Sequence, residues 1–331
     1  MKYKYSGFIP QNIAPKGAKK LVVYDSNNKK VNTIPLGKMT HPTSNKLYSF
    51  GLVSDTHVMA NGYIATPYSS FKLDNALSWF EEQGALFVCN CGDMTNHGLW
   101  NSDGTKDLTQ FAEYKRVCDL HNIPIYGVCG NHDSYFKAIT ETLTDLETYT
   151  NKGLYYSVTQ GNDVFIFIGQ PSSAIPMNDE TFTWLKSTLE ANKEKRFFIF
   201  VHPYLDSGNA HSSYGNDFFG NWSYTSEFKQ VLSNYNTTLF NGHSHINFIH
   251  QETDKTANYT NNGFHSLHVP SLMGYREIVE GEASVESLGY LVDVYADCIV
   301  LNARDFGTYS SGDMINPKWV PIATYKIDTT N

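Results

Sequence analysis

The chain has 331 residues, of which 41% are hydrophobic and 18% are charged. These values are typical of a folded globular protein and exclude the disordered and collagen-like classes. The net charge is −8, from 33 acidic and 25 basic residues, and no basic stripe is present, so nucleic acid is not the expected partner.

Residues 1–45 differ in pattern from the rest of the chain. Leu21–Tyr24 and Lys30–Ile34 are strand-like runs on either side of the turn residues Asp25–Asn28, and this arrangement predicts a β-hairpin. The segment carries no group of reactive side chains. We therefore predict an N-terminal β-hairpin extension, residues 1–45, followed by one main domain, residues 46–331.

Strand-like and helix-like patterns alternate from residue 46 onward. Apolar runs predict strands at 48–53, 86–91, 124–129, 164–168, 197–201, 237–241, 289–295 and 298–303. Helical spacing predicts helices near 72–83, 107–121, 135–149, 179–192 and 224–234, with Asp179 as the N-cap of the fourth. This order predicts an α/β fold of two stacked mixed sheets with helices outside.

Five short polar clusters follow predicted strands in a fixed order. They are Asp55-Thr56-His57, Gly92-Asp93, Gly130-Asn131-His132-Asp133, Val201-His202-Pro203 and Gly242-His243-Ser244-His245. Ligands of open α/β sheets bind beyond the carboxyl ends of strands, so the clusters predict one shared site. Their carboxylates, imidazoles and amide oxygen form the mixed ligand set that holds two metal cations side by side for hydrolysis at phosphorus.

The order and residue types of these clusters resemble the calcineurin-like metallophosphoesterase family. The resemblance implies a four-layer α-β-β-α sandwich and two divalent or trivalent metal ions, Mn, Fe or Zn. It implies that the first ion is bound by Asp55, His57 and His245. The second would be bound by Asn131, His202 and His243, and Asp93 would bridge the two. The implied reaction is hydrolysis of a small-molecule phosphomonoester or phosphodiester by a hydroxide held between the ions.

The same resemblance gives His132 a catalytic role rather than a metal-binding one. The family histidine donates a hydrogen bond to phosphate and a proton to the leaving oxygen, as a general acid. Three residues after the bridging aspartate, relatives carry either an aspartate that orients this histidine or a metal-binding tyrosine, whereas this chain has Asn96. A tyrosinate-coordinated purple iron centre is therefore not expected. We predict that Asp133 replaces the missing aspartate in part.

Two other functions use the same fold. The first is a nuclease, which the acidic charge disfavours, and the second is a non-catalytic binding or structural component, which the complete ligand set disfavours. The segment Pro203–Trp222 is rich in aromatic residues and is expected to be a loop over the pocket, either stacking on a nucleobase or packing against the protein.

Cysteine usage and hydropathy indicate the compartment. The chain has five cysteines, an odd number, and they lie mostly in apolar runs, so we expect reduced thiols, with Cys89 and Cys91 as buried packing residues. No run is long enough to span a membrane, and Met1–Tyr5 lacks the apolar core of a secretory signal. We therefore expect a cytoplasmic protein without membrane contact; the oligomeric state does not follow from these residues.

Overall fold

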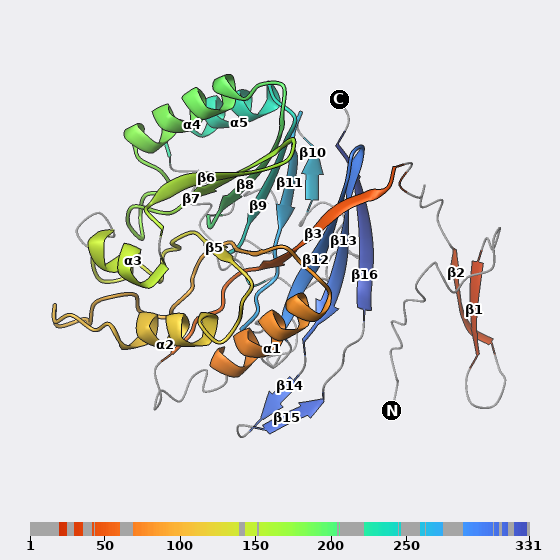
Figure 1. The fold of residues 1–331 in the computed structure, drawn as a ribbon, viewed down its shortest axis with the longest axis horizontal. Coiled ribbons are helices and arrows are strands. Elements are labelled where there is room, and N and C mark those ends of the chain that lie inside the picture. The colour runs from red at the N-terminus through yellow and green to blue at the C-terminus, as the bar shows by residue number, and fades with distance from the viewer. Residues whose placement is uncertain are drawn as a thin grey trace.

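Two mixed six-stranded sheets form the body of the protein (Figure 1). The structure is a computed structural model that describes residues 20–24, 30–35, 42, 44–59, 69–138, 143–150, 152–203, 205, 222–243, 245, 259–261, 263–273, 287–306, 308–310, 313–316 and 321–329. The first sheet has the strand order β16 (Pro321–Asp328), β13 (Cys298–Asp305), β12 (Leu288–Tyr295), β3 (Lys46–Val53), β4 (Val88–Asn90) and β5 (Ile125–Gly127). The second has the order β10 (Tyr259–Asn261), β11 (His265–His268), β9 (Thr237–Asn241), β8 (Arg196–Val201), β7 (Asp163–Ile168) and β6 (Tyr155–Gln160).

Each sheet contains a run of parallel strands. Strands β3, β4 and β5 are parallel neighbours, and so are β7, β8, β9 and β11. The other pairs in the two sheets are antiparallel. Because parallel strands end at the same edge, each sheet gathers several strand ends at one rim.

Helices cover the outer faces of both sheets, so the protein has four layers. Helices α1 (Ser69–Glu82), α2 (Thr109–Cys118) and α3 (Leu143–Thr150) lie on the first sheet, and α4 (Asp179–Ala191) and α5 (Thr225–Ser233) lie on the second (Figure 1). Along β7, Phe165 and Phe167 pack between the sheets, whereas Val164, Ile166 and Ile168 pack under the outer helices. This period-two alternation lets one strand serve two apolar layers, and the predicted α-β-β-α sandwich is confirmed.

Aromatic side chains fill much of the space between the sheets. The rings of Phe50 and Phe165 meet edge to face at 5.3 Å between centroids, and those of Phe167 and Phe200 stack at 4.8 Å. Both geometries are favourable for aromatic pairs. Cys89 and Cys91 are buried in the same core, as predicted, and all five cysteines are free thiols.

Two local predictions differ from the structure. Helix α3 begins at Leu143 rather than near residue 135, because the chain makes hydrogen-bonded turns after His132, with the Tyr135 N–H donating to the His132 carbonyl at 3.3 Å. The N-cap of α4 is Asn178 rather than Asp179, since the Asn178 side chain accepts from the Thr181 N–H at 2.8 Å. Asp179 then lies in the first turn, where its charge favours the helix dipole.

Two small hairpins complete the described chain. Strands β1 (Lys20–Tyr24) and β2 (Lys30–Pro35) pair antiparallel, which confirms the predicted N-terminal hairpin, and they form a sheet separate from the two large ones (Figure 1). Strands β14 (Thr308–Ser310) and β15 (Asp313–Asn316) form the other. The boundary at residue 45 stays a prediction. Among the helices in the described ranges, none combines the length and apolarity needed to cross a bilayer.

Candidate metal centre

The five polar clusters lie at the carboxyl ends of β3, β4, β5, β8 and β9, which come from both sheets. Backbone hydrogen bonds fix the connecting loops to one another. The Asp55 N–H donates to the Gly92 carbonyl and the His57 N–H donates to the Asp93 carbonyl, each at 2.9 Å, and the Gly242 N–H donates to the His202 carbonyl at 3.1 Å. The side chains that these loops carry are therefore held on a rigid frame.

Backbone strain is concentrated at this rim. In the described part of the chain, five residues other than glycine have a positive φ, and each is a predicted metal ligand: Asp55 at 52°, His57 at 42°, Asp93 at 49°, His243 at 78° and His245 at 53°. Left-handed conformations cost residues with a β-carbon about 1–3 kcal/mol each, so they persist only where the surrounding structure enforces them. Such clustering is typical of functional sites.

Two glycines allow the loops to approach closely. Gly92 has a φ of 103°, and a β-carbon there would lie 2.7 Å from the ring of His202. At Gly130, a β-carbon would lie 2.1 Å from the Asp93 carboxylate. Neither position has room for a side chain, so the glycines in these two motifs are needed to bring the ligand residues together.

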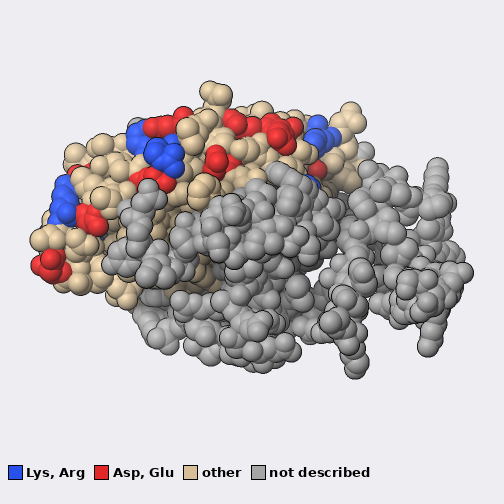
Figure 2. Space-filling model, turned by 90° about the horizontal axis from the view of Figure 1, so that it is seen from below, with Lys and Arg blue, Asp and Glu red and all other residues tan. Residues whose placement is uncertain are grey.

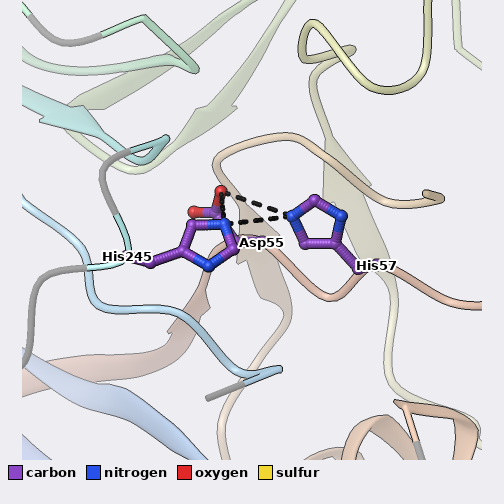
Figure 3. A group of neighbouring side chains, drawn as sticks. All are labelled: Asp55, His57 and His245. Carbon is purple, nitrogen blue, oxygen red and sulfur yellow. Dashed lines mark hydrogen bonds and ion pairs between the residues drawn. The ribbon is translucent and has the colours of Figure 1, made fainter. Parts of the chain in front are cut away.

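The first group of side chains contains Asp55, His57 and His245 (Figure 3). The Nε2 atom of His245 lies 3.2 Å from Asp55 Oδ1 and 3.1 Å from His57 Nε2. The Nδ1–H of His57 donates to Asn96 Oδ1 at 3.2 Å, so the neutral ring has its lone pair on Nε2. Asp55 Oδ1 is buried and has no hydrogen-bond partner. A buried carboxylate oxygen without a donor, facing two imidazole nitrogens, fits a cation.

The second group contains Asp93, Asn131, His202 and His243. Asn131 Oδ1 lies 2.9 Å from both His202 Nε2 and His243 Nδ1, and His202 Nε2 lies 3.1 Å from Asp93 Oδ2. The Nδ1–H of His202 donates to the Cys91 carbonyl at 2.9 Å, which leaves Nε2 with the lone pair in the neutral ring. Several electron-pair donors thus converge on one point, the arrangement that a second cation needs.

Asp93 lies between the two groups. Its Oδ2 atom is 3.6 Å from His57 Nε2, in the first group, and 3.1 Å from His202 Nε2, in the second. Its Oδ1 atom accepts from the His132 N–H at 2.8 Å, so the carboxylate is held in one orientation. A single oxygen that faces both groups has the position of a bridging ligand.

The electrostatics of the site keep its carboxylates charged. Burial alone would raise the pKa of Asp93, but the attraction and hydrogen bonding of His202, with the charges of His57 and His132, hold it below its usual range. Burial would likewise raise the pKa of Asp55, which His245 and His57 hold well below its usual value. Both carboxylates are therefore ionised and available as ligands.

The two imidazoles of the second group differ in their pKa values. Burial lowers the pKa of His202, but the Asp93 carboxylate outweighs this effect and raises it to about 9. Burial, with the positive charge of His202, lowers the pKa of His243 to about 3. In the metal-free protein His202 is thus protonated at neutral pH and His243 is not, and a bound cation would replace the proton of His202.

His132 lies beside the first group and is oriented by the backbone. Its Nδ1–H donates to the Asn96 carbonyl at 2.7 Å, and its ring meets the ring of His57 edge to face at 4.7 Å between centroids. A reactive atom of His132 lies within 4.8 Å of ligand atoms of both His57 and Asp93. The Asn96 backbone carbonyl therefore fixes the orientation of the His132 ring.

The side chains of Asn96 and Asp133 make different kinds of contact near the site. The Asn96 side chain orients His57 rather than His132. The Asp133 carboxylate accepts from the backbone N–H groups of Met94, Thr95 and Gly130 and from the Thr95 hydroxyl, at 2.8–3.0 Å. With those partners it ties two loops together, and the partial replacement of the missing aspartate by Asp133 stays a prediction.

Two further predictions concern the aromatic loop and the distribution of surface charge. Tyr204 and residues 206–221, which include most of the predicted aromatic loop, lie outside the described residues. Figure 2 shows acidic and basic side chains interspersed on the described part of one face, without a basic stripe there.

Solved structures with the same fold include enzymes and a protein described by its anchoring role. A dimetal phosphatase from Danio rerio has a TM-score of 0.57 and 13% identity over 86% of this chain and 100% of that chain. The purple acid phosphatase PPD1 of yellow lupin has a TM-score of 0.55 and 13% identity over 85% of this chain and 53% of that chain. GAP50, the anchor in the inner membrane complex of Plasmodium, has a TM-score of 0.53 and 14% identity over 87% of this chain and 90% of that chain. At these identities the likeness shows the fold alone.

The sequence itself identifies the family. No curated protein sequence matches the chain, but the family model described as calcineurin-like phosphoesterase matches residues 48–247. This range is more than half of the chain and contains all five polar clusters at the rim. The chain therefore belongs to the calcineurin-like phosphoesterase family.

Proposed function

We propose that the protein is a dinuclear metal-dependent phosphoesterase that hydrolyses small phosphomonoesters or phosphodiesters. The observation that supports this most strongly is the position of Asp93 Oδ2, which faces one ligand group through His57 and the other through His202. Two ions about 3.5–4 Å apart suit in-line displacement at phosphorus. When bound, such a pair lowers the pKa of a coordinated water and offsets charge on the phosphoryl oxygens.

The side chains of this chain have distinct roles in the proposal. Asp55, His57 and His245 hold the first ion, and Asn131, His202 and His243 hold the second, with Asp93 shared. Asn96 fixes the ring of His57, and the Asn96 carbonyl fixes the ring of His132. The Nε2 atom of His132 then donates a proton to the leaving oxygen, which is needed most when the leaving alcohol is a weak acid.

A metal-supplemented assay tests the proposed function. Protein loaded with Mn, Fe or Zn is incubated with p-nitrophenyl phosphate and with bis-p-nitrophenyl phosphate, and metal content is measured by elemental analysis. We expect metal-dependent hydrolysis of at least one ester and two ions per chain. Full metal loading with no hydrolysis of either ester supports the non-catalytic binding component instead.

Replacing His132 by alanine separates its catalytic role from metal binding. We expect metal content to stay near two ions per chain, while turnover falls about 10²–10⁴-fold for an ester with a poor leaving group and much less for p-nitrophenyl phosphate. The measurement compares kcat for both esters with elemental analysis of the same sample. Loss of a metal ion would make His132 a ligand, and equal losses on both esters would exclude the acid role.

The metal-free protein should lose stability as the pH rises from about 6.5 to about 9. The pKa of His202 is about 9 in the folded protein, above its value of about 6.5 in an unfolded chain. Its stabilising effect is therefore complete below pH 6.5 and is lost as the pH rises through the folded pKa. His57, His243 and His268, whose pKa values burial lowers, stay neutral throughout this window.

Chemical unfolding of the metal-free protein at a series of pH values measures this effect. His202→Gln should flatten the decline between pH 6.5 and 9, because the titrating imidazole is gone. Metal affinity of the unaltered protein should rise over the same range, since the cation must replace the proton on His202. A metal-free protein that becomes more stable as the pH rises toward 9 would contradict the assignment.

A further inference from the structure

Two large aromatic side chains beside His132 are exposed to solvent. Tyr135 and Phe136 follow the Gly130–Asp133 cluster directly and have exposed fractions of 49% and 40%. Most large aromatic side chains of the described chain are buried in the three apolar clusters instead. Exposing two adjacent rings costs hydrophobic stabilisation, so their place next to the candidate general acid calls for an explanation.

The two rings are held in a fixed arrangement by their neighbours. The ring of Tyr135 stacks on the ring of His132 at 5.2 Å between centroids and 29° between planes, and Phe136 meets Tyr135 edge to face at 4.8 Å. Phe136 also contacts the ring of His97 at 5.8 Å, with 30° between planes. Aromatic pairs of this geometry are favourable, so the exposed faces form a preorganised surface, here called the aromatic ledge (His97, Tyr135 and Phe136).

The ledge lies next to His132, the candidate general acid. In the proposed reaction the proton moves from His132 to the leaving oxygen, so the rest of the leaving alcohol must be in contact with His132 or just beyond it. Tyr135 is in direct ring contact with His132, and His132 is in ring contact with His57 of the first metal group. The rings of His57, His132 and Tyr135 thus form a continuous series from the first metal group to the exposed surface.

We propose that the aromatic ledge is a leaving-group subsite, and that the protein prefers phosphate esters whose leaving alcohol carries a flat aromatic ring. This inference rests on the proposed phosphoesterase function and adds a substrate class to it. The exposed face of Tyr135 stacks on the ring of the leaving group, and Phe136 borders it on one side. An aryl or benzyl group and a nucleobase share this chemistry, since each offers a planar π-face.

A matched pair of substrates isolates the effect of the ring. Benzyl phosphate and cyclohexylmethyl phosphate have leaving alcohols of similar acidity and size, but only the first is flat. We expect kcat/KM to be about tenfold higher for the benzyl ester. A nucleoside phosphate compared with the corresponding ribose phosphate, which lacks the base, tells whether the ring is a nucleobase or a simple aryl group.

Leucine substitutions remove the flat rings and keep apolar bulk. In Tyr135→Leu/Phe136→Leu the ratio of kcat/KM for the benzyl ester to kcat/KM for the cyclohexylmethyl ester should fall to about one. Tyr135→Phe keeps the ring and should keep the preference. Leu120→Ala, at an exposed apolar residue just after α2 with an exposed fraction of 61%, is the control for a general effect of surface substitution.

Binding gives a readout that does not depend on turnover. Calorimetry with benzylphosphonate and cyclohexylmethylphosphonate, which are not hydrolysed, should show tighter binding of the first to the metal-loaded protein, and equal binding in the double leucine variant. If both esters are hydrolysed equally well by the unaltered protein, or if the preference survives the double substitution, the subsite is refuted while the phosphoesterase function stands. If no ester is hydrolysed, the phosphoesterase function fails, and the phosphonates alone decide whether the ledge binds a ring.

Discussion

Replacing Asp93 by alanine is expected to release both metal ions and to lower kcat/KM by at least about 1,000-fold. Its Oδ2 atom faces His57 at 3.6 Å and His202 at 3.1 Å, so one substitution takes a ligand from each metal group. The two imidazoles lose the anion that faces them as well. Metal-ion catalysis contributes several kcal/mol of transition-state stabilisation, and about 4 kcal/mol corresponds to about 1,000-fold in rate.

Elemental analysis and steady-state kinetics on the same preparation measure both effects. Asp93→Asn is the closer replacement, because it keeps the shape and an oxygen but loses the charge, and it should bind metal more weakly than the unaltered protein. Asp103→Asn changes an exposed carboxylate, and it should retain both ions and full activity. Retention of two ions by Asp93→Ala would show that this carboxylate does not bridge the site.

The second large effect concerns stability. Asp163, the first residue of β7, and Arg196, the first of β8, form a buried ion pair with nitrogen to oxygen distances of 2.8 and 2.9 Å. Arg196 also donates to the Tyr295 carbonyl and the Thr329 hydroxyl at 2.8 Å each, and the Tyr48 hydroxyl donates to Asp163. Burial, together with the Asp163 charge, raises the pKa of Tyr48 above its usual range, so the phenol stays a donor. The network joins strands of both sheets.

Asp163→Ala should therefore lower the free energy of unfolding by about 3–5 kcal/mol, because it leaves the Arg196 guanidinium buried without its anion. Urea unfolding measures the change. The double substitution Asp163→Leu/Arg196→Met should be more stable than either single variant, since well-packed apolar side chains can replace a buried pair. Metal uptake per folded molecule should not change, because both residues begin their strands while the candidate metal centre lies at the opposite, carboxyl ends.

A loss below about 1 kcal/mol for Asp163→Ala would mean that water reaches the pair and screens it, as it does for surface ion pairs. A double variant that loses about the sum of the two single losses would mean that the energy comes from independent packing of the two side chains rather than from the charge pair. Lys115→Ala, which removes an exposed pair with Asp119 within and just after α2, is the matched control and should cost about 0.5 kcal/mol or less.

The sequence predicted the location of the site better than the contacts within it. The candidate ligand residues could be found because their chemistry is unusual and because they follow apolar strands, where parallel topology brings distant residues together. The contacts of Asn96 and Asp133 depend on loop geometry that no side-chain pattern records. The group that orients His132 is a backbone carbonyl, which any residue at position 96 would supply, so the identity of that residue carried no signal.

Edge strands were predicted least well. Strand β6, Tyr155–Gln160, was not predicted, because the polar side chains of Ser157, Thr159 and Gln160 interrupt its apolar pattern at the edge of the second sheet. The left-handed conformations of Asp55 and His243 could not be predicted from the sequence either. Glycine is the usual residue in that conformation, and neither position has one. A histidine or an aspartate at such a position does not indicate a left-handed conformation in the sequence.

The most direct test of the bridged metal centre is anomalous diffraction from crystals of the protein loaded with Mn or Fe. We predict two anomalous peaks about 3.5–4 Å apart. One should lie among Asp55, His57 and His245, the other among Asn131, His202 and His243, with Asp93 in contact with both. A single peak, or two peaks that do not share Asp93, would contradict the account.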